Sequence, residues 1–235
     1  MTPLLEAIVL TPEDARQARA CGIDRLEAVA SIKVGGLTPD ETVLSGILAA
    51  GVPTMVMLRP HARSFVYDEA DMRAIFDAIA MARRLGAHGL VFGALTPERR
   101  IDTLRLEQVL DAAAGLPLTF HRAFDEAADL REAHAVLGRY RDAGVAQVLT
   151  SGGRATASEG AERLRELVHA GGIEVLAGSG VDAQSIGPLH ARVQARQYHA
   201  GRGLRREHRY DAPLDPDAVA RIRAALAYPP AGLSG

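Results

Sequence analysis

The chain has 235 residues, of which 48% are hydrophobic and 24% charged, and its formal net charge is −2. This composition predicts a globular protein with a substantial core and gives no electrostatic reason to expect nucleic acid or an anionic membrane as a partner. No apolar run approaches the roughly 20 residues that span a bilayer, and the first residues lack the features of a signal peptide, so we expect a cytoplasmic protein. The single cysteine, Cys21, excludes an internal disulfide and any multi-cysteine metal site.

Short apolar runs alternate with amphipathic segments along the whole chain, which is the pattern of strands alternating with helices. The segment 71–85 is a clear example of a helix with one apolar face. We expect eight strands, at 4–10, 25–30, 54–58, 89–92, 118–121, 147–150, 174–177 and 195–199. The run Thr11-Pro12-Glu13 predicts a helix start, because it places a capping residue, a proline and an acid in order. The same signal recurs at Thr38-Pro39-Asp40 and Asp215-Pro216-Asp217.

Eight such units in 235 residues, with no linker or break in composition, predict an α/β protein with one domain over residues 1–235. The fold that we expect is a single (β/α)8 TIM-type barrel, whose usual size is about 250 residues. A doubly wound open sheet is the alternative. It is less favoured, because Thr11-Pro12-Glu13 follows the first strand where a nucleotide-binding sheet would carry a Gly-x-Gly turn.

Polar and charged residues gather near the carboxyl ends of the expected strands, where barrels carry out their chemistry. The run 119–125 brings a titratable ring, a cation and a carboxylate into one short stretch at the end of the fifth strand. The candidates for acid–base or clamping roles are Glu6, Glu27, Arg59, His121, Arg122 and Asp125. Because side chains alternate between the two faces of a strand, Glu6 and Glu27 each share a face with apolar neighbours. If that face is the barrel interior, both need cations, and we expect Arg59 and Arg122 to supply them; the alternative is a buried ion network that only fixes strand register.

Glycine-rich loops follow the last three expected strands, and barrels commonly bind phosphate after strands seven and eight. The candidates for this role are Ser151, Gly152, Gly178, Ser179, Gly180 and Gly201, with Arg202 beside them. The same glycines could equally form tight turns between barrel elements.

Four other histidines are expected to be solvated or capping residues, namely His88, His134, His169 and His190, and the basic run 205–209 is expected to be a loop beside acids. Met55 and Met57 are expected to fill the core.

The motifs resemble those of the CutC family, named copper homeostasis protein C. The resemblance runs through the whole chain in the same order. It is carried by Leu5-Glu6, Arg25-Leu26-Glu27, Gly35 to Pro39, Arg59-Pro60, Phe65 and Tyr67, Thr119 to Asp125, Leu149 to Gly152 and Ala177 to Gly180. It implies a TIM-type barrel, a cytoplasmic location, a homodimer or larger homo-oligomer, and a role in copper handling. It also implies copper-binding cysteines near the first two strands, but this sequence has Ile8, Val9 and Val29 at those positions.

Two functions of different classes remain open at this point. The protein could bind copper, through His121, His199 and the carboxylates. Alternatively, it could be a barrel enzyme for a small anionic or phosphorylated metabolite, with Glu6 or Glu27 as general acid or base, His121 as proton shuttle, and Arg59 and Arg122 clamping the substrate. A non-catalytic binder of the same metabolite is a third possibility. Because Cu(I) prefers sulfur ligands, the absence of the family cysteines predicts weak Cu(I) binding.

Overall fold

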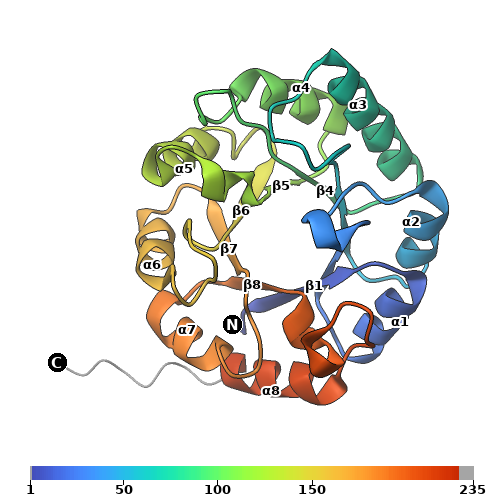
Figure 1. The fold of residues 1–235 in the computed structure, drawn as a ribbon, viewed down its shortest axis with the longest axis vertical. Coiled ribbons are helices and arrows are strands. Elements are labelled where there is room, and N and C mark those ends of the chain that lie inside the picture. The colour runs from blue at the N-terminus through green and yellow to red at the C-terminus, as the bar shows by residue number, and fades with distance from the viewer. Residues whose placement is uncertain (1, 228–235) are drawn as a thin grey trace.

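The computed structural model describes residues 2–227, and there the chain forms a closed barrel of parallel strands surrounded by helices (Figure 1). Each strand pairs with the next along the chain, and β8 pairs with β1 to close the barrel. The strands are β1 (Leu4–Val9), β2 (Arg25–Ala28), β3 (Thr54–Met57), β4 (Gly89–Phe92), β5 (Leu118–Phe120), β6 (Val145–Thr150), β7 (Glu174–Gly178) and β8 (Gln197–Ala200). The predicted single (β/α)8 TIM-type barrel is confirmed.

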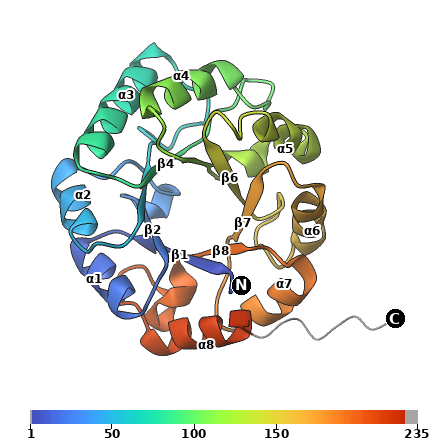
Figure 2. The same cartoon turned by 180° about the vertical axis from the view of Figure 1, so that it is seen from behind.

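A helix follows every strand, and Figure 2 shows the same ring of helices from behind. The helices are α1 (Pro12–Ala20), α2 (Glu41–Leu48), α3 (Glu69–Arg84), α4 (Thr103–Ala113), α5 (Leu130–Gly138), α6 (Ala161–Ala170), α7 (Ile186–Val193) and α8 (Pro216–Ala227). Short 3-10 turns precede the helix after β2 (η1, Ile32–Val34), β5 (η2, Arg122–Glu126) and β8 (η3, Arg202–Leu204; η4, Arg206–His208). None of these helices is long and apolar enough to cross a membrane within residues 2–227.

The predicted helix starts are correct for α1 and α8 but not for α2. Thr11 caps α1, because its hydroxyl accepts a hydrogen bond from the Asp14 backbone N–H (3.1 Å) and Pro12 occupies the first turn. The run Thr38-Pro39 does not open α2. Asp40 caps that helix instead by accepting from the Val43 N–H (2.9 Å), while the Thr38 hydroxyl accepts from the Arg59 N–H (2.9 Å). The Thr38 side chain therefore ties its loop to the end of β3.

The barrel has an apolar layer outside its strands and a smaller one inside. Most buried side chains lie between the strands and the helices. Within the barrel, Met55 and Met57 pack with Ile8, Val29 and Val91, so the expected core role of the two methionines is confirmed. Because strand side chains alternate, Glu6 and Glu27 face the interior beside Ile8 and Val29.

Two histidines that were expected to be solvated or capping are instead buried. His134 on α5 is 5% exposed, and His190 on α7 is 9% exposed. His190 Nδ1 lies 2.9 Å from the hydroxyl oxygen of Tyr198, which is itself fully buried. Both residues lie within their helices rather than at the ends, on the side that is buried against the rest of the fold.

Candidate functional site

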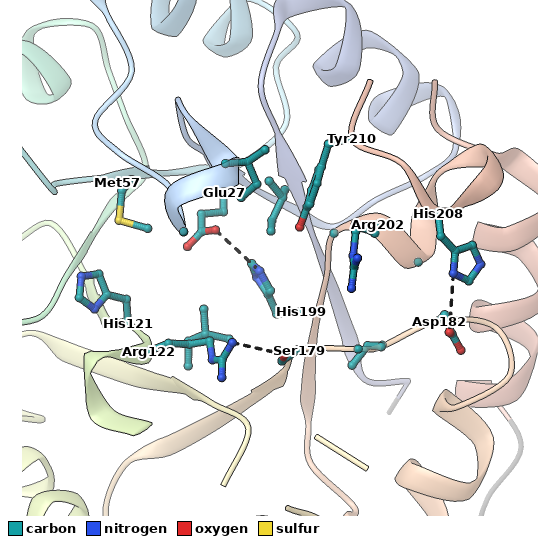
Figure 3. Close-up of a pocket in the computed structure, with 18 of the residues that line it drawn as sticks. Glu27, Met57, His121, Arg122, Ser179, Asp182, His199, Arg202, His208 and Tyr210 are labelled. Atoms are coloured by element: carbon teal, nitrogen blue, oxygen red, sulfur yellow. Dashed lines mark hydrogen bonds and ion pairs between the residues drawn. The ribbon is translucent and has the colours of Figure 1, made fainter. Parts of the chain in front are cut away.

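The carboxyl ends of the strands surround a cavity of about 390 Å³ (Figure 3). The sequence candidates that line it are Glu27, Arg59, His121, Arg122, Ser179, Gly180, His199 and Gly201. The candidates that are not part of its wall are Glu6, Asp125, Ser151, Gly152 and Gly178. Strands far apart in the sequence thus contribute acidic, basic and imidazole side chains to one hollow at the barrel mouth.

A chain of buried polar groups crosses the barrel interior at this end. The strand register places Glu6 on β1 beside Arg25 on β2 and His199 on β8. One Glu6 oxygen accepts from Arg25 Nε, and the other lies 2.8 Å from His199 Nδ1. The Arg25 guanidinium also donates to Gln197 Oε1 (2.7 Å). Both carboxylate oxygens of Glu6 are therefore satisfied by neighbouring strands.

Glu27 lies at the other end of this chain and is only partly satisfied. Its Oε2 atom is 3.7 Å from His199 Nε2, an ion-pair distance rather than a hydrogen bond (Figure 3). Its Oε1 atom is buried and has no hydrogen-bond partner within residues 2–227. The residue is 3% exposed although it lines the cavity. Glu27 is thus a buried carboxyl group with free bonding capacity next to open space.

The two glutamates have opposite pKa shifts. Burial disfavours the charge of Glu6, but the hydrogen bond from His199 and the charge of Arg25 outweigh burial and lower the pKa of Glu6. Burial raises the pKa of Glu27 to about 7, since the charge of His199 compensates only in part and Glu6 adds repulsion. Burial opposes the charge of His199, but Glu27 and Glu6 raise its pKa overall. At neutral pH, Glu6 is ionised, while Glu27 is poised to gain or lose a proton.

His121 and Arg59 form the wall near β3 and β5. The Arg59 guanidinium lies 4.6 Å from the centre of the Phe65 ring, and its Nη1 atom donates to the carbonyl oxygens of Val34 (3.1 Å) and Gly36 (3.3 Å). Burial and the positive charge of Arg59 lower the pKa of His121 to about 3. A histidine that is neutral throughout the physiological range does not suit the proton-shuttle role expected for it.

Arg122 and Asp125 form a separate network that shapes the loops after β6 and β7. Arg122 donates to Asp125 (2.7 Å), to the Ser151 hydroxyl (3.0 Å) and to the Ser179 hydroxyl (3.3 Å). Asp125 also accepts from the backbone N–H groups of Ser151 (3.2 Å) and Gly153 (3.0 Å). Asp125 therefore organises loops behind the cavity, whereas Arg122 reaches the cavity itself.

The rim above β7 and β8 presents unused donors. The backbone N–H groups of four residues there donate to no backbone acceptor within the described chain: Ser179, Gly180, Gly201 and Gly203. The exposed side chain of Arg202 lines the cavity and has no ion-pair or hydrogen-bond partner among residues 2–227. Close packing explains some of the glycines, because a Cβ atom on Gly178 would meet Leu149 at 2.6 Å and one on Gly203 would meet the Val181 carbonyl oxygen at 2.1 Å.

The predicted cations of the two glutamates were wrong. Arg25 and His199 contact Glu6, and His199 is the near neighbour of Glu27, whereas Arg59 and Arg122 bind loop groups. The role of Arg25 was missed although it shares a strand face with Glu27. It follows from strand register, since Glu6 pairs with Arg25 between β1 and β2.

Comparison with known proteins places the chain in a family. The CutC family model matches residues 4–203. A CutC protein of Klebsiella pneumoniae is 37% identical over 232 residues, covering 95% of this chain and 92% of the relative. This chain belongs to the CutC family. A copper homeostasis protein cutC homolog of Caenorhabditis elegans is 36% identical, covering 90% and 84% of the two chains. The crystal structure of a CutC protein from Streptococcus agalactiae superposes with a TM-score of 0.78 at 29% identity, covering 85% and 98%.

The donors at the mouth of this CutC chain do not match the preferences of Cu(I). Ile8 and Val29 lie inside the barrel, where the resemblance implies thiols, and neither can coordinate a metal. Among the described residues, Met57 contributes the one sulfur atom in the cavity wall, a thioether of the kind that Cu(I) prefers. Cys21 lies at the C-terminal end of α1, outside the cavity wall. No group of three or more His, Cys, Asp or Glu side chains within residues 2–227 could hold a metal ion, so the candidate pair His121 and His199 is not part of such a group.

Proposed function

We propose that the barrel mouth binds a small anionic, phosphorylated metabolite and that Glu27 transfers a proton to or from it. The observation that carries this proposal is Glu27 itself. It is a buried carboxyl group with a pKa of about 7, an oxygen that meets no partner in residues 2–227, and direct contact with the cavity. A general acid or base works best with a pKa near the operating pH, and this group has one.

The rim supports the anionic character of the ligand. Arg122 and Arg202 line the cavity, and so do Ser179, Gly180, Gly201 and Gly203, whose N–H groups donate to no backbone acceptor in the described chain. Backbone N–H groups and arginine side chains are the usual donors to phosphate oxygens. The ligand would hold its anionic group at this rim and its reacting part above Glu27.

His199 supports the proton-transfer role. Its Nδ1 atom is held by the ionised Glu6, so its Nε2 atom faces Glu27 at 3.7 Å. The raised pKa of each partner allows a proton to reside on either of them near neutral pH. Glu6 and Arg25 act as positioning residues, because they orient His199 without lining the cavity.

The alternative of a purely structural ion network fits only half of the cluster. Arg25, Glu6 and Gln197 form closed contacts that can fix the register of β1, β2 and β8. Glu27 adds a desolvated carboxyl group with an unmet hydrogen bond, which costs about 1–3 kcal/mol. A binding or catalytic role explains why such a group lies beside a cavity.

Copper binding, which the names of the relatives suggest, is not the function that this mouth supports best. Its donors are carboxylates, the imidazoles of His121 and His199, whose Nδ1 atoms already contact neighbours, and one thioether, and this set does not match Cu(I). We therefore expect any direct binding of Cu(I) to be weak. The expected homodimer or larger homo-oligomer stays a prediction.

Phosphate binding is the experimental test of this proposal. The melting temperature of the protein is measured against increasing inorganic phosphate, with chloride at matched ionic strength as the control for screening. We expect a phosphate-specific rise. Arg202→Gln should weaken it, whereas Arg206→Gln, which alters an exposed arginine outside the cavity wall, should preserve it. An identical response to both salts, or an equal loss in both variants, would contradict the proposed anion site.

A further inference from the structure

The tautomer of His121 is set by the backbone around it. The Ala123 N–H donates to His121 Nδ1 at 3.2 Å. In a neutral imidazole, a ring nitrogen that accepts a hydrogen bond carries no proton, so the proton of His121 resides on Nε2. That Nε2 atom is buried and has no acceptor within residues 2–227. His121 thus presents one donor that the described chain leaves unused.

This donor stays neutral because of its surroundings. The ring is 4% exposed and lies beside Phe65 and Phe120, with Arg59 as the charged neighbour that opposes protonation. A neutral N–H group can donate a hydrogen bond to a carbonyl oxygen and stabilise the negative charge that develops there, while it keeps its own proton. The chemistry available to His121 is therefore hydrogen-bond donation to an oxygen of the ligand.

Glu27 belongs to the same cavity but comes from a distant strand. It lies on β2, and His121 follows β5, three strands further round the barrel. Figure 3 shows both side chains among those that line the hollow. One contributes an unused donor, and the other an unused oxygen that can accept a proton. A ligand that satisfies both has an acceptor oxygen on one side and a removable proton on the other.

We propose that the substrate is a small phosphorylated carbonyl compound, and that the reaction is a proton transfer at the carbon next to its carbonyl group. This inference rests on the proposed function. In the forward step the Glu27 carboxylate takes the proton from that carbon. The C–H electron pair forms a C=C bond, and the carbonyl π pair moves onto oxygen. The resulting enolate oxygen accepts a hydrogen bond from His121 Nε2–H. Return of the proton from the Glu27 carboxylic acid to the same carbon re-forms the carbonyl group and completes an exchange. Where that carbon carries a hydroxyl group, transfer of the hydroxyl proton to the enolate oxygen, followed by protonation of the former carbonyl carbon by Glu27, gives the isomer.

The first experiment determines the state of His121 directly. ¹⁵N NMR of the ligand-free protein should show a neutral ring with its proton on Nε2, without titration between pH 5 and 8. The spectrum of His121→Asn identifies the signal. A proton on Nδ1, or titration near the ordinary pKa of histidine, would overturn the inference whether or not any ligand binds.

The second experiment uses ligands that share a phosphate but differ in the carbonyl. Dissociation constants are measured for inorganic phosphate, glycerol 3-phosphate and dihydroxyacetone phosphate. In the wild type, the ketone should bind roughly ten-fold more tightly than the alcohol, which is the effect of about one hydrogen bond. This preference should disappear in His121→Asn, while the affinity for inorganic phosphate stays the same.

The asparagine variant is chosen to preserve the fold. Its side-chain oxygen can still accept from the Ala123 N–H, as a helix-capping residue does, but nothing replaces the Nε2–H donor. The matched control is His88→Asn. His88 also accepts a backbone N–H at Nδ1, from Thr54 at 3.3 Å, but it is exposed, lies before β4 and does not line the cavity. We expect this control to behave as the wild type.

The reaction is tested by proton exchange in D₂O with a panel of three- to six-carbon aldose and ketose phosphates. At least one member should incorporate deuterium next to its carbonyl, and Glu27→Gln should abolish the incorporation. If no phosphate binds, the proposed function fails. If phosphates bind but the carbonyl gives no advantage, or no member exchanges, the inference fails and the anion site stands.

Discussion

Two buried charged clusters lie within this barrel, and they differ in how completely they are satisfied. In the first, Arg205 is 2% exposed and donates to both carboxylate oxygens of Asp14, at 3.0 and 2.8 Å. The same guanidinium donates to the carbonyl oxygens of Ala212 (2.9 Å) and Ile8 (3.3 Å), and Asp14 accepts from the Leu10 N–H (2.8 Å). This cluster joins β1, α1 and the loop before α8.

In the second cluster, at the barrel mouth, some of the buried polar atoms have hydrogen-bond partners and others do not. Glu6 has a partner for each oxygen, but Glu27 Oε1 and His121 Nε2 have none within residues 2–227. Both clusters are buried, so burial alone does not distinguish them; they differ in whether all their polar atoms have partners. A buried charge whose atoms are all satisfied stabilises the fold, whereas one left unsatisfied beside a cavity is available to a ligand.

The largest expected effect comes from breaking the satisfied cluster. Asp14→Ala would leave the Arg205 guanidinium buried without its carboxylate, which typically costs about 3–5 kcal/mol of unfolding free energy. The measurement is urea unfolding followed by circular dichroism. Asp211→Ala, which removes one partner of the exposed Arg209–Asp211 pair, is the control and should change little. Equal effects of the two substitutions would refute the distinction between them.

Neutralising Glu27 should have a smaller effect that depends on pH. Because its pKa is raised to about 7 in the folded protein, against about 4.3 in an unfolded chain, its proton favours folding at low pH. That stabilisation is lost as the pH rises from about 4.3 to about 7. Glu27→Gln should therefore gain stability relative to the wild type over this range, by on the order of 3–4 kcal/mol, since one pKa unit corresponds to about 1.4 kcal/mol.

The control for this pH dependence is Glu13→Gln. Glu13 is an exposed glutamate whose pKa is lowered by its hydrogen bonds with Arg16 and Gln17. Its contribution has the opposite sign, being present above the unfolded pKa and lost in acid, so this variant should not gain stability as the pH rises. A Glu27→Gln profile parallel to that of the wild type would show that Glu27 titrates normally.

The smallest expected effect is the retention of Cu(I) by the protein. Since the thiols implied by the resemblance are absent at Ile8, Val9 and Val29, Cu(I) should be removed by a competing chelator, as measured by metal analysis of the recovered protein. Cys21→Ser should change nothing, because Cys21 lies at the end of α1 outside the cavity wall. Stoichiometric copper that resists the chelator would contradict this expectation.

The barrel could be predicted from the sequence because strand and helix periodicities, capping signals and regular spacing all favour the same fold. The partners of the buried charged residues could not be predicted in this way. The partners of Glu6 depend on strand register, which brings Arg25 and His199 beside it from positions far along the chain. Arg205 lies in a basic run that resembles a solvated loop, and its partner Asp14 is 191 residues away. Which atoms of Glu27 and His121 lack a hydrogen-bond partner depends on loop geometry, and no local sequence pattern encodes that geometry.

The titration of Glu27 tests most directly whether this residue can transfer a proton near neutral pH. Carboxyl ¹³C NMR of protein labelled at glutamate, with Glu27→Gln to assign the signal, reports its pKa in the folded state. We expect a midpoint near 7, because burial raises the pKa of Glu27 and His199 offsets the rise only in part. A midpoint near 4.3, the ordinary value for glutamate, would show that Glu27 is a solvated or fully paired carboxylate and would contradict its proposed role in proton transfer.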